Sequence, residues 1–76
     1  MATPKEADEL IEELCELIDG IGSETKERAE ESGFDMEDIR ERAVDMGETV
    51  ARLKRVSDRQ IECLENWKRG VSGWVH

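Results

Sequence analysis

Apolar residues in this chain recur at intervals of three and four and never stand more than two in a row. Such intervals place side chains on one face of an α-helix, whereas a strand needs alternation. Runs of β-branched or aromatic residues, which favour strands, do not occur. The sequence therefore predicts an all-α fold. It also excludes a transmembrane helix, which needs about 20 consecutive apolar residues.

The first helix is predicted from residue 4 to about residue 19. In the sequence T-P-K-E, Thr3 can cap the helix, Pro4 suits the first helical position and Glu6 can close a capping box. An apolar stripe follows, formed by Ala7, Leu10, Ile11, Leu14, Leu17, Ile18 and Ile21.

Two glycines interrupt this stripe, and each costs about 1 kcal/mol in a helix interior relative to alanine. We expect a kink or short break at Gly20 and Gly22, with Gly20 as a left-handed cap of the first helix or Ser23 as the cap of a new one. The alternative is a first helix that continues to residue 32. Residues 24–32 are polar nearly all round and are expected to pack least well.

A second helix is predicted over about residues 36–55, after a turn at Gly33. Asp35 is its expected cap, and Phe34 can pack on Ile39 as a hydrophobic staple. The intervals of its stripe are four, three, four and three, which is heptad spacing. The residues are Ile39, Ala43, Met46, Val50 and Leu53.

The start signature occurs again before a third helix over about residues 58–74. Ser57 can cap it, Gln60 can close a capping box, and Val56 can pack on Ile61. The heptad register nevertheless carries straight through this point to Trp74. The alternative to a break at 56–57 is therefore one long helix of roughly 60 Å.

The predicted fold is a small helical hairpin or three-helix bundle with a coiled-coil-like heptad seam, with residues 1–76 as one domain. A single narrow stripe buries little apolar surface in 76 residues. Small scaffolds without disulfides or metals often make up this deficit by oligomerising. We therefore expect a homodimer.

The charge of −9 is distributed unevenly. Residues 1–38 sum to −11 and residues 39–76 to +2. Either the two halves pack together through complementary charges, or the acidic half is displayed to a basic partner. Direct nucleic-acid binding is disfavoured because the chain repels phosphate. Membrane binding is disfavoured because interfacial helices prefer basic faces. A halophilic origin would instead relate the acidity to solubility.

No catalytic or metal-binding pattern is visible. Cys15 and Cys63 lie far apart and each neighbours a glutamate, which blunts thiol reactivity. His76 is the single histidine, so zinc is not expected. Solvated carboxylates at this density are poor general acids or bases. We expect no enzyme activity and no cofactor. Because the thiols suit a reducing compartment and no secretory signal is visible, we expect a cytoplasmic protein.

The C-terminal segment is a candidate contact surface. Trp67, Val71 and Trp74 share one helical face, and they either cover the end of the bundle or anchor a partner or a second copy. Gly70 and Gly73 are expected to loosen the end of this helix.

The predicted function is protein–protein interaction by an acidic helical face. Small acidic phage-encoded inhibitors, including anti-CRISPR proteins and DNA mimics, place carboxylates where their partners hold phosphates, and the analogy rests on size and charge. The alternative is a homodimeric coiled-coil adaptor without an inhibitory role. The first hypothesis expects unpaired, exposed carboxylates, and the second expects them to pair with Arg40, Arg42, Arg52 and Arg59. The acidic-face candidates are Glu9, Glu13, Glu16, Glu24, Glu27 and Glu31.

Overall fold

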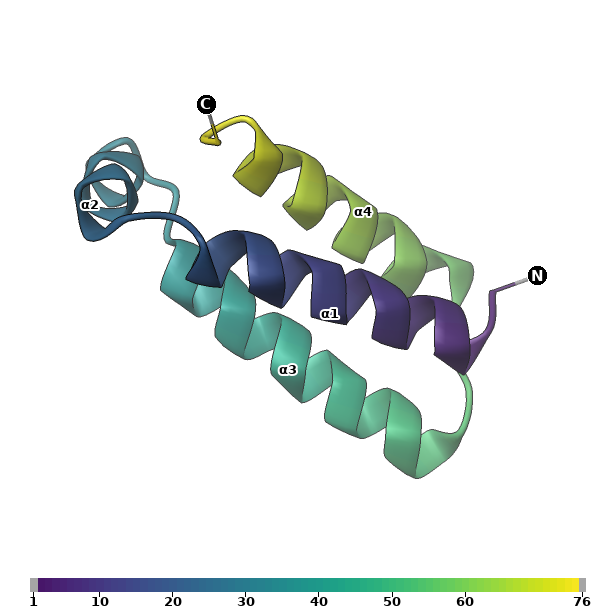
Figure 1. Cartoon of the computed structure of the whole chain (residues 1–76). Helices are drawn as coiled ribbons and strands as arrows, with labels where there is room; N and C mark the ends of the chain where they lie inside the picture. The colour runs from purple at the N-terminus through teal and green to yellow at the C-terminus, as the bar shows by residue number, and fades with distance from the viewer. Residues whose placement is uncertain (1, 76) are drawn as a thin grey trace.

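The computed structural model describes residues 2–75, and over that range the chain forms four α-helices and no strand (Figure 1). The helices are α1 (Pro4–Asp19), α2 (Ser23–Glu31), α3 (Met36–Leu53) and α4 (Asp58–Ser72). The predicted all-α class is confirmed. The fold has one helix more than the predicted three, because α2 is a separate short helix and not a continuation of α1.

Side-chain caps begin α1 and α3 at the predicted positions. Thr3 Oγ1 accepts a hydrogen bond from the backbone N–H of Glu6 at 3.2 Å. Asp35 Oδ1 accepts one from the N–H of Asp38 at 3.1 Å. Each bond satisfies one of the backbone donors that a helix leaves free in its first turn. Because donor and acceptor are three residues apart, the sequence alone locates these starts.

A break separates α3 from α4, so the single long helix does not form. Lys54 ends α3 in the left-handed conformation, with φ 57° and ψ 32°, and donates its N–H to the carbonyl of Val50. Ser57 then begins α4 with a complete capping box. Ser57 Oγ accepts from the N–H of Gln60 at 3.2 Å, and Gln60 Oε1 accepts from the N–H of Ser57 at 2.9 Å. The sequence signals this restart but not the left-handed lysine, because φ above zero is uncommon outside glycine.

The turn between α1 and α2 differs in detail from the expectation. Gly20 has φ −82° and ψ −9°, so it is not a left-handed cap. The N–H of Ile21 donates to the carbonyl of Ile18, which brings the Ile21 side chain into the core. Gly22 occupies the cap position of α2, and Ser23 is its first helical residue rather than its cap. Burial of an apolar side chain therefore organises this turn.

Gly33 ends α2 at the predicted boundary. Its φ is +90°, a conformation that strains residues with a side chain. The N–H groups of Gly33 and Phe34 donate to the carbonyls of Glu30 and Ala29, at 2.9 and 2.8 Å. This pair of bonds is a Schellman motif.

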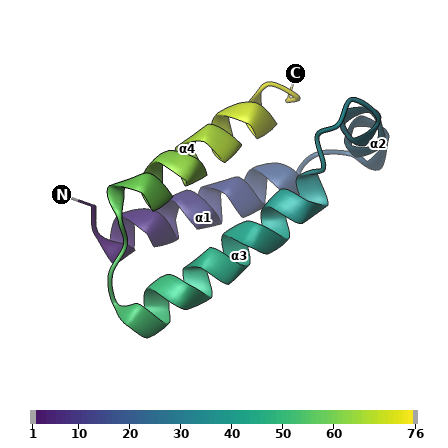
Figure 2. The ribbon, with the colours of Figure 1, turned by 180° about the vertical axis from the view of Figure 1, so that it is seen from behind.

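Helix α1 lies between α3 and α4 and packs along both, whereas α3 and α4 touch each other at few points. Figures 1 and 2 show this from two sides, with α1 nearer the viewer in Figure 1 and behind α3 and α4 in Figure 2. Helix α2 crosses one end and packs mainly against α3. The molecule measures 37 × 19 × 19 Å. Its radius of gyration, 12.6 Å, exceeds the roughly 11 Å of a rounded domain of this length, so the fold is elongated.

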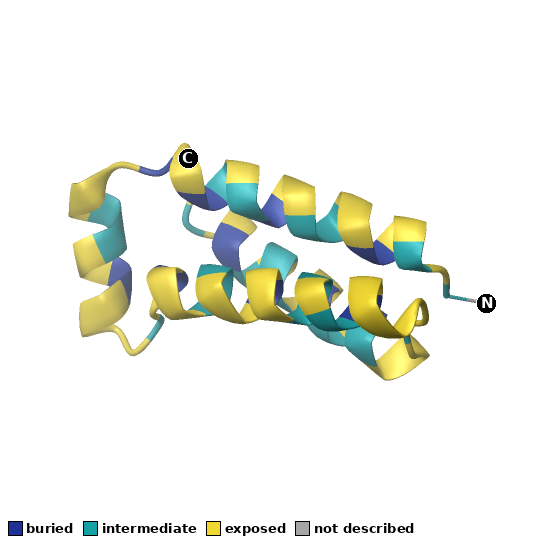
Figure 3. Cartoon of the chain, turned by 90° about the horizontal axis from the view of Figure 1, so that it is seen from below, coloured by how far each residue is buried: buried dark blue, intermediate teal, exposed yellow. Residues whose placement is uncertain are grey.

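The core draws on all four helices. Figure 3 shows a buried stripe along the inner side of the helices and exposed residues on the outer side. No polar or charged side chain is buried among residues 2–75. Ala29 is the one buried residue of α2, which agrees with its predicted poor packing. The largest fully buried side chains are Leu14, Ile18, Met36, Val50, Leu64 and Val71.

Two glycines allow close approach between elements. A Cβ on Gly47 of α3 would lie 3.2 Å from Ile11 Cδ1 on α1. A Cβ on Gly70 of α4 would lie 3.0 Å from Cε2 and Cζ of Phe34, whose ring is also tilted against Trp74 with centroids 6.4 Å apart. Gly70 therefore makes room for an aromatic ring and does not merely loosen the helix end, as the sequence suggested.

Candidate protein-interaction surface

The outer side of α1 is acidic. Glu9, Glu13 and Glu16 recur at intervals of four and three, so they share one helical face, and all three are exposed. The apolar stripe of α1 occupies the other side and is covered by α3 and α4. Burial of that stripe thus directs these carboxylates into solvent.

A second group of carboxylates lies on α2. Glu24, Glu27 and Glu31 are spaced by three and four and are all exposed. Because Ala29 is the only buried residue of this helix, its remaining surface is free to carry charge. We call these six glutamates, three on α1 and three on α2, the acidic face.

The acidic face is largely without ion pairs inside the molecule. Four ion pairs shorter than 4 Å occur within residues 2–75, and one of them, between Glu13 and Lys68, includes an acidic-face residue. Arg40 pairs with Asp19, and Arg42 pairs with Asp38 of its own helix. None of the arginines that the adaptor hypothesis names is paired with the acidic face in the described chain.

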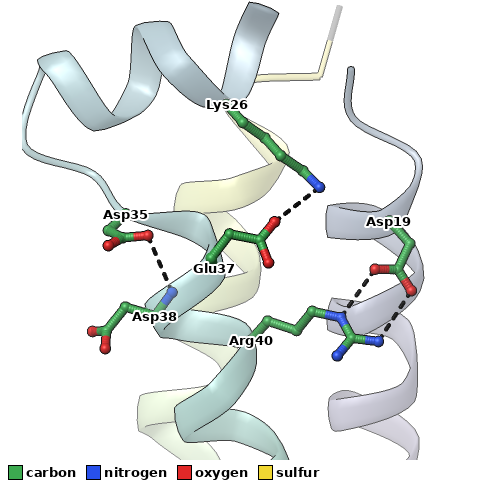
Figure 4. A network of polar contacts seen from close by, with 6 residues as sticks. All are labelled: Asp19, Lys26, Asp35, Glu37, Asp38 and Arg40. Carbon is green, nitrogen blue, oxygen red and sulfur yellow. Dashed lines mark hydrogen bonds and ion pairs between the residues drawn. The ribbon is translucent and has the colours of Figure 1, made fainter. Parts of the chain in front are cut away.

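Three of the four ion pairs lie at boundaries between helices, and Figure 4 shows two of them. Arg40 of α3 donates from Nε and Nη2 to the two carboxylate oxygens of Asp19 on α1, at 2.9 and 3.2 Å. Lys26 of α2 reaches Glu37 of α3 at 3.0 Å. Asp19–Arg40 and Glu13–Lys68 join the first half of the chain to the second, so charges also flank the seam between the halves, whereas Lys26–Glu37 lies within the first half.

The Asp19–Arg40 pair changes the acidity of its carboxyl group. The hydrogen bonds from the Arg40 guanidinium hold the pKa of Asp19 below its ordinary value, and partial burial opposes that effect. Both side chains are partly exposed, at 57% and 38%, so solvent screens the pair and limits its effect on stability.

The three residues of the predicted C-terminal anchor are not equivalent. Val71 is fully buried in the core, so a partner cannot reach it in this structure. Trp67 and Trp74 are half-buried and pack against the edge of the core. The helical period predicts that the three residues share one face. It does not predict which part of that face is covered by another helix.

The described residues form no enclosed reaction site. Cys15 and Cys63 are half-buried free thiols, and no group of three metal-ligating side chains converges within residues 2–75. One surface depression, about 430 Å³ in volume, is open to solvent and is lined by Glu13, Glu16, Leu17, Lys68 and Ser72. Of the four helices, none combines the length and apolar content needed to span a bilayer.

The fold and its surface define a small all-α protein with an acidic outer face. The chain matches no family model, and neither the curated proteins nor the solved structures include a significant match. Its function is therefore inferred from its own surfaces.

Proposed function

We propose that this chain is a non-enzymatic protein-interaction module whose acidic face binds a basic surface of another protein. The observation that carries the proposal is that five of its six glutamates are exposed and make no ion pair in the described chain. Unpaired surface carboxylates of one sign attract a basic partner and raise its association rate.

The finer form of the proposal is an inhibitor that occupies a nucleic-acid-binding groove, in the manner of DNA mimics and anti-CRISPR proteins of phages. The carboxylates of Glu9, Glu13 and Glu16 are separated along the axis of α1 by about 6 and 4.5 Å. Phosphates recur every 3.4 Å of axis along one DNA strand, which is the same order of spacing. This similarity supports a basic, phosphate-binding groove as the surface that the helix binds.

The test compares two triple charge reversals in a pull-down from nuclease-treated lysate. The face variant is Glu9→Lys, Glu16→Lys and Glu27→Lys, which leaves the Glu13–Lys68 pair intact. The control is Glu41→Lys, Glu48→Lys and Glu62→Lys on α3 and α4, where all three residues are exposed and unpaired in the described chain. Both variants change the net charge equally.

We expect the control to retain the protein captured by the wild type and the face variant to lose it. Added duplex DNA should displace the captured protein if its bound surface is a nucleic-acid groove. Equal capture by both variants would remove the acidic face as the binding surface. Capture that is unaffected by DNA would remove only the mimic form.

A homodimeric adaptor remains the second candidate function. The feature that favours it lies on the opposite side of the molecule, where apolar side chains of α3 and α4 are incompletely covered. Its partner would bind through the half-buried tryptophans rather than through the carboxylates.

A further inference from the structure

Helices α3 and α4 carry two parallel rows of apolar residues with seven-residue spacing, and the two rows are buried to different extents. We call them the inner row and the outer row. The inner row is at most 1% exposed and comprises Met36, Ala43, Val50, Leu64 and Val71. The outer row is half-buried, except for Leu53 at 51% exposure, and comprises Ile39, Met46, Leu53, Trp67 and Trp74.

The position of α1 explains the difference. Gly47 on α3 faces α1, because a Cβ built on it would lie 3.2 Å from Ile11 Cδ1, and Lys68 on α4 pairs with Glu13 of α1. Residues 47 and 68 each lie four positions after a residue of the inner row, Ala43 and Leu64, and so share a side of the helix with that row. The two contacts therefore show that the inner row faces α1. The outer row lies on the side of the inner row that faces away from α1, along the boundary between α3 and α4, which make few contacts with each other. Figure 2 views the molecule from that side.

The helices that carry the outer row have no net charge, unlike the rest of the chain. Residues 36–72 hold eight acidic and eight basic side chains, whereas residues 4–31 hold eleven acidic and three basic ones. Two copies would repel each other strongly through α1 and α2. They would not repel each other through α3 and α4, so this face is the one at which a second copy can approach.

The charge of α3 and α4 also differs slightly between their two ends. Arg52, Arg55 and Arg59 lie around the α3–α4 connection and make no ion pair within residues 2–75. Residues 46–64, toward the connection, hold four basic and three acidic side chains, whereas residues 36–45 and 65–72, toward the other end, hold five acidic and four basic ones. Asp38 lies at the start of α3 and Asp45 near its middle. Fourteen residues of helix separate Asp38 from Arg52, or about 21 Å. A second copy in the opposite direction brings the basic end of each molecule to the acidic end of the other.

The face is large enough for a stable pair. The whole side of the molecule, 37 by 19 Å, sets an upper limit of about 700 Å² per copy, or about 1,400 Å² in total, which exceeds the roughly 1,000 Å² that a specific interface needs. A two-fold axis makes such an interface self-complementary.

We infer that a second copy of this chain covers the outer row in an antiparallel two-fold pair, in which the α3–α4 faces of two molecules form the interface. The pair leaves α1 of each copy on the outside, with its acidic face exposed. It uses residues distinct from the acidic face, and so it stands or falls independently of the proposed binding by that face. It shares the half-buried tryptophans with the homodimeric alternative.

The first test measures mass in solution by sedimentation equilibrium for three proteins. Leu53→Glu places a charge on the outer row, at a side chain already 51% exposed. Val44→Glu is the matched control, since Val44 is 40% exposed on the same helix but belongs to neither row. We expect the wild type and the control to reach twice the chain mass of 8.7 kDa. Leu53→Glu should raise the dissociation constant about tenfold or more.

A wild type that stays at the mass of one chain at every concentration would overturn the inference. Equal dissociation of both variants, with helical circular dichroism retained, would overturn the assignment to the outer row. Because these two side chains are exposed, neither change is expected to unfold the chain.

The second test concerns the antiparallel direction. Arg52→Glu with Arg59→Glu places acidic groups opposite Asp38 and Asp45, and should dissociate the pair. Adding Asp38→Lys and Asp45→Lys in the same chain exchanges both ends, and should restore it. A parallel pair would bring like ends together in every one of these proteins, so absence of restoration in a folded quadruple variant contradicts the antiparallel arrangement.

Discussion

Adding one methyl group at Gly70 and at Gly47 should change stability in opposite directions. At Gly70 the new Cβ meets two ring carbons of Phe34 at 3.0 Å, well inside ordinary contact. The ring cannot withdraw freely, because it also packs on Trp74. Overpacking costs about 1–3 kcal/mol, whereas replacing a helical glycine by alanine gains at most about 1 kcal/mol. We expect Gly70→Ala to lower the free energy of unfolding by about 1 kcal/mol.

At Gly47 the new Cβ meets a single atom at 3.2 Å, the terminal Cδ1 of Ile11. That methyl group ends a flexible, half-buried side chain, so it can move by the few tenths of an ångström required. The gain in helix propensity then dominates, and Gly47→Ala should stabilise the protein by about 0.5–1 kcal/mol.

Thermal unfolding followed by circular dichroism separates these outcomes. For a domain of this size, 1 kcal/mol corresponds to about 4–8 °C in Tm. The two variants should therefore differ by roughly 6 °C or more, with Gly70→Ala the lower. A Gly70→Ala protein as stable as Gly47→Ala would refute the packing of Phe34 against α4. Both variants are measured at the same protein concentration, because self-association makes Tm concentration-dependent.

Two further predictions concern local interactions. Ser57→Ala removes the acceptor of the capping box at the start of α4 and should cost about 1 kcal/mol in chemical denaturation, while Ser23→Ala, at an exposed residue with no side-chain cap, should change stability little. Asp19→Asn tests the ion pair with Arg40 as a function of pH. Because the folded state lowers the pKa of Asp19, the pair contributes fully above the ordinary value of 3.8, and its contribution is lost as the pH falls through the lowered pKa. The stability difference between wild type and Asp19→Asn should thus be constant near neutral pH and shrink in acid, and a difference that grows in acid would contradict the assigned direction.

Self-association and acidity have a common consequence if both proposals hold. An antiparallel pair displays two acidic faces on opposite outer sides of one assembly. The pair then binds two basic sites at the same time, on one partner or on two. Leu53→Glu, which dissociates the pair, should abolish this simultaneous binding. The acidic face of a single chain would still bind one site.

The helix starts and the turn at Gly33 were predictable because their causes are local. Thr3, Asp35 and Ser57 each cap a backbone N–H three residues away. Gly33 takes a conformation that other residues avoid. The two alternatives left open have different causes: packing of Ile21 decides the one at Gly20, whereas backbone conformation and the Ser57 capping box decide the one at 56–57. Burial of Ile21 bends the chain after α1, and a left-handed Lys54 ends α3.

The surfaces were less predictable. The helical period placed Trp67, Val71 and Trp74 on one face, but Val71 is fully buried while the tryptophans are half-buried. The pair between Glu13 and Lys68 joins residues 55 positions apart, and no local pattern indicates it. The sequence predicts only that Gly70 loosens the end of its helix. Its close approach to Phe34 is not predictable from local sequence, because Phe34 lies between α2 and α3, far from Gly70 in the chain.

The amino-acid order by itself determined that this chain is helical, where most helices begin, and that negative charge gathers in its first half. Those properties follow from hydrogen bonds and side-chain spacing within a few residues. Only the tertiary structure decided which of the two heptad rows is covered, which carboxylates stay unpaired and why Gly70 must be small. Each of these depends on the position of α1 or Phe34 against α3 and α4, and so on contacts between residues that are distant in the chain.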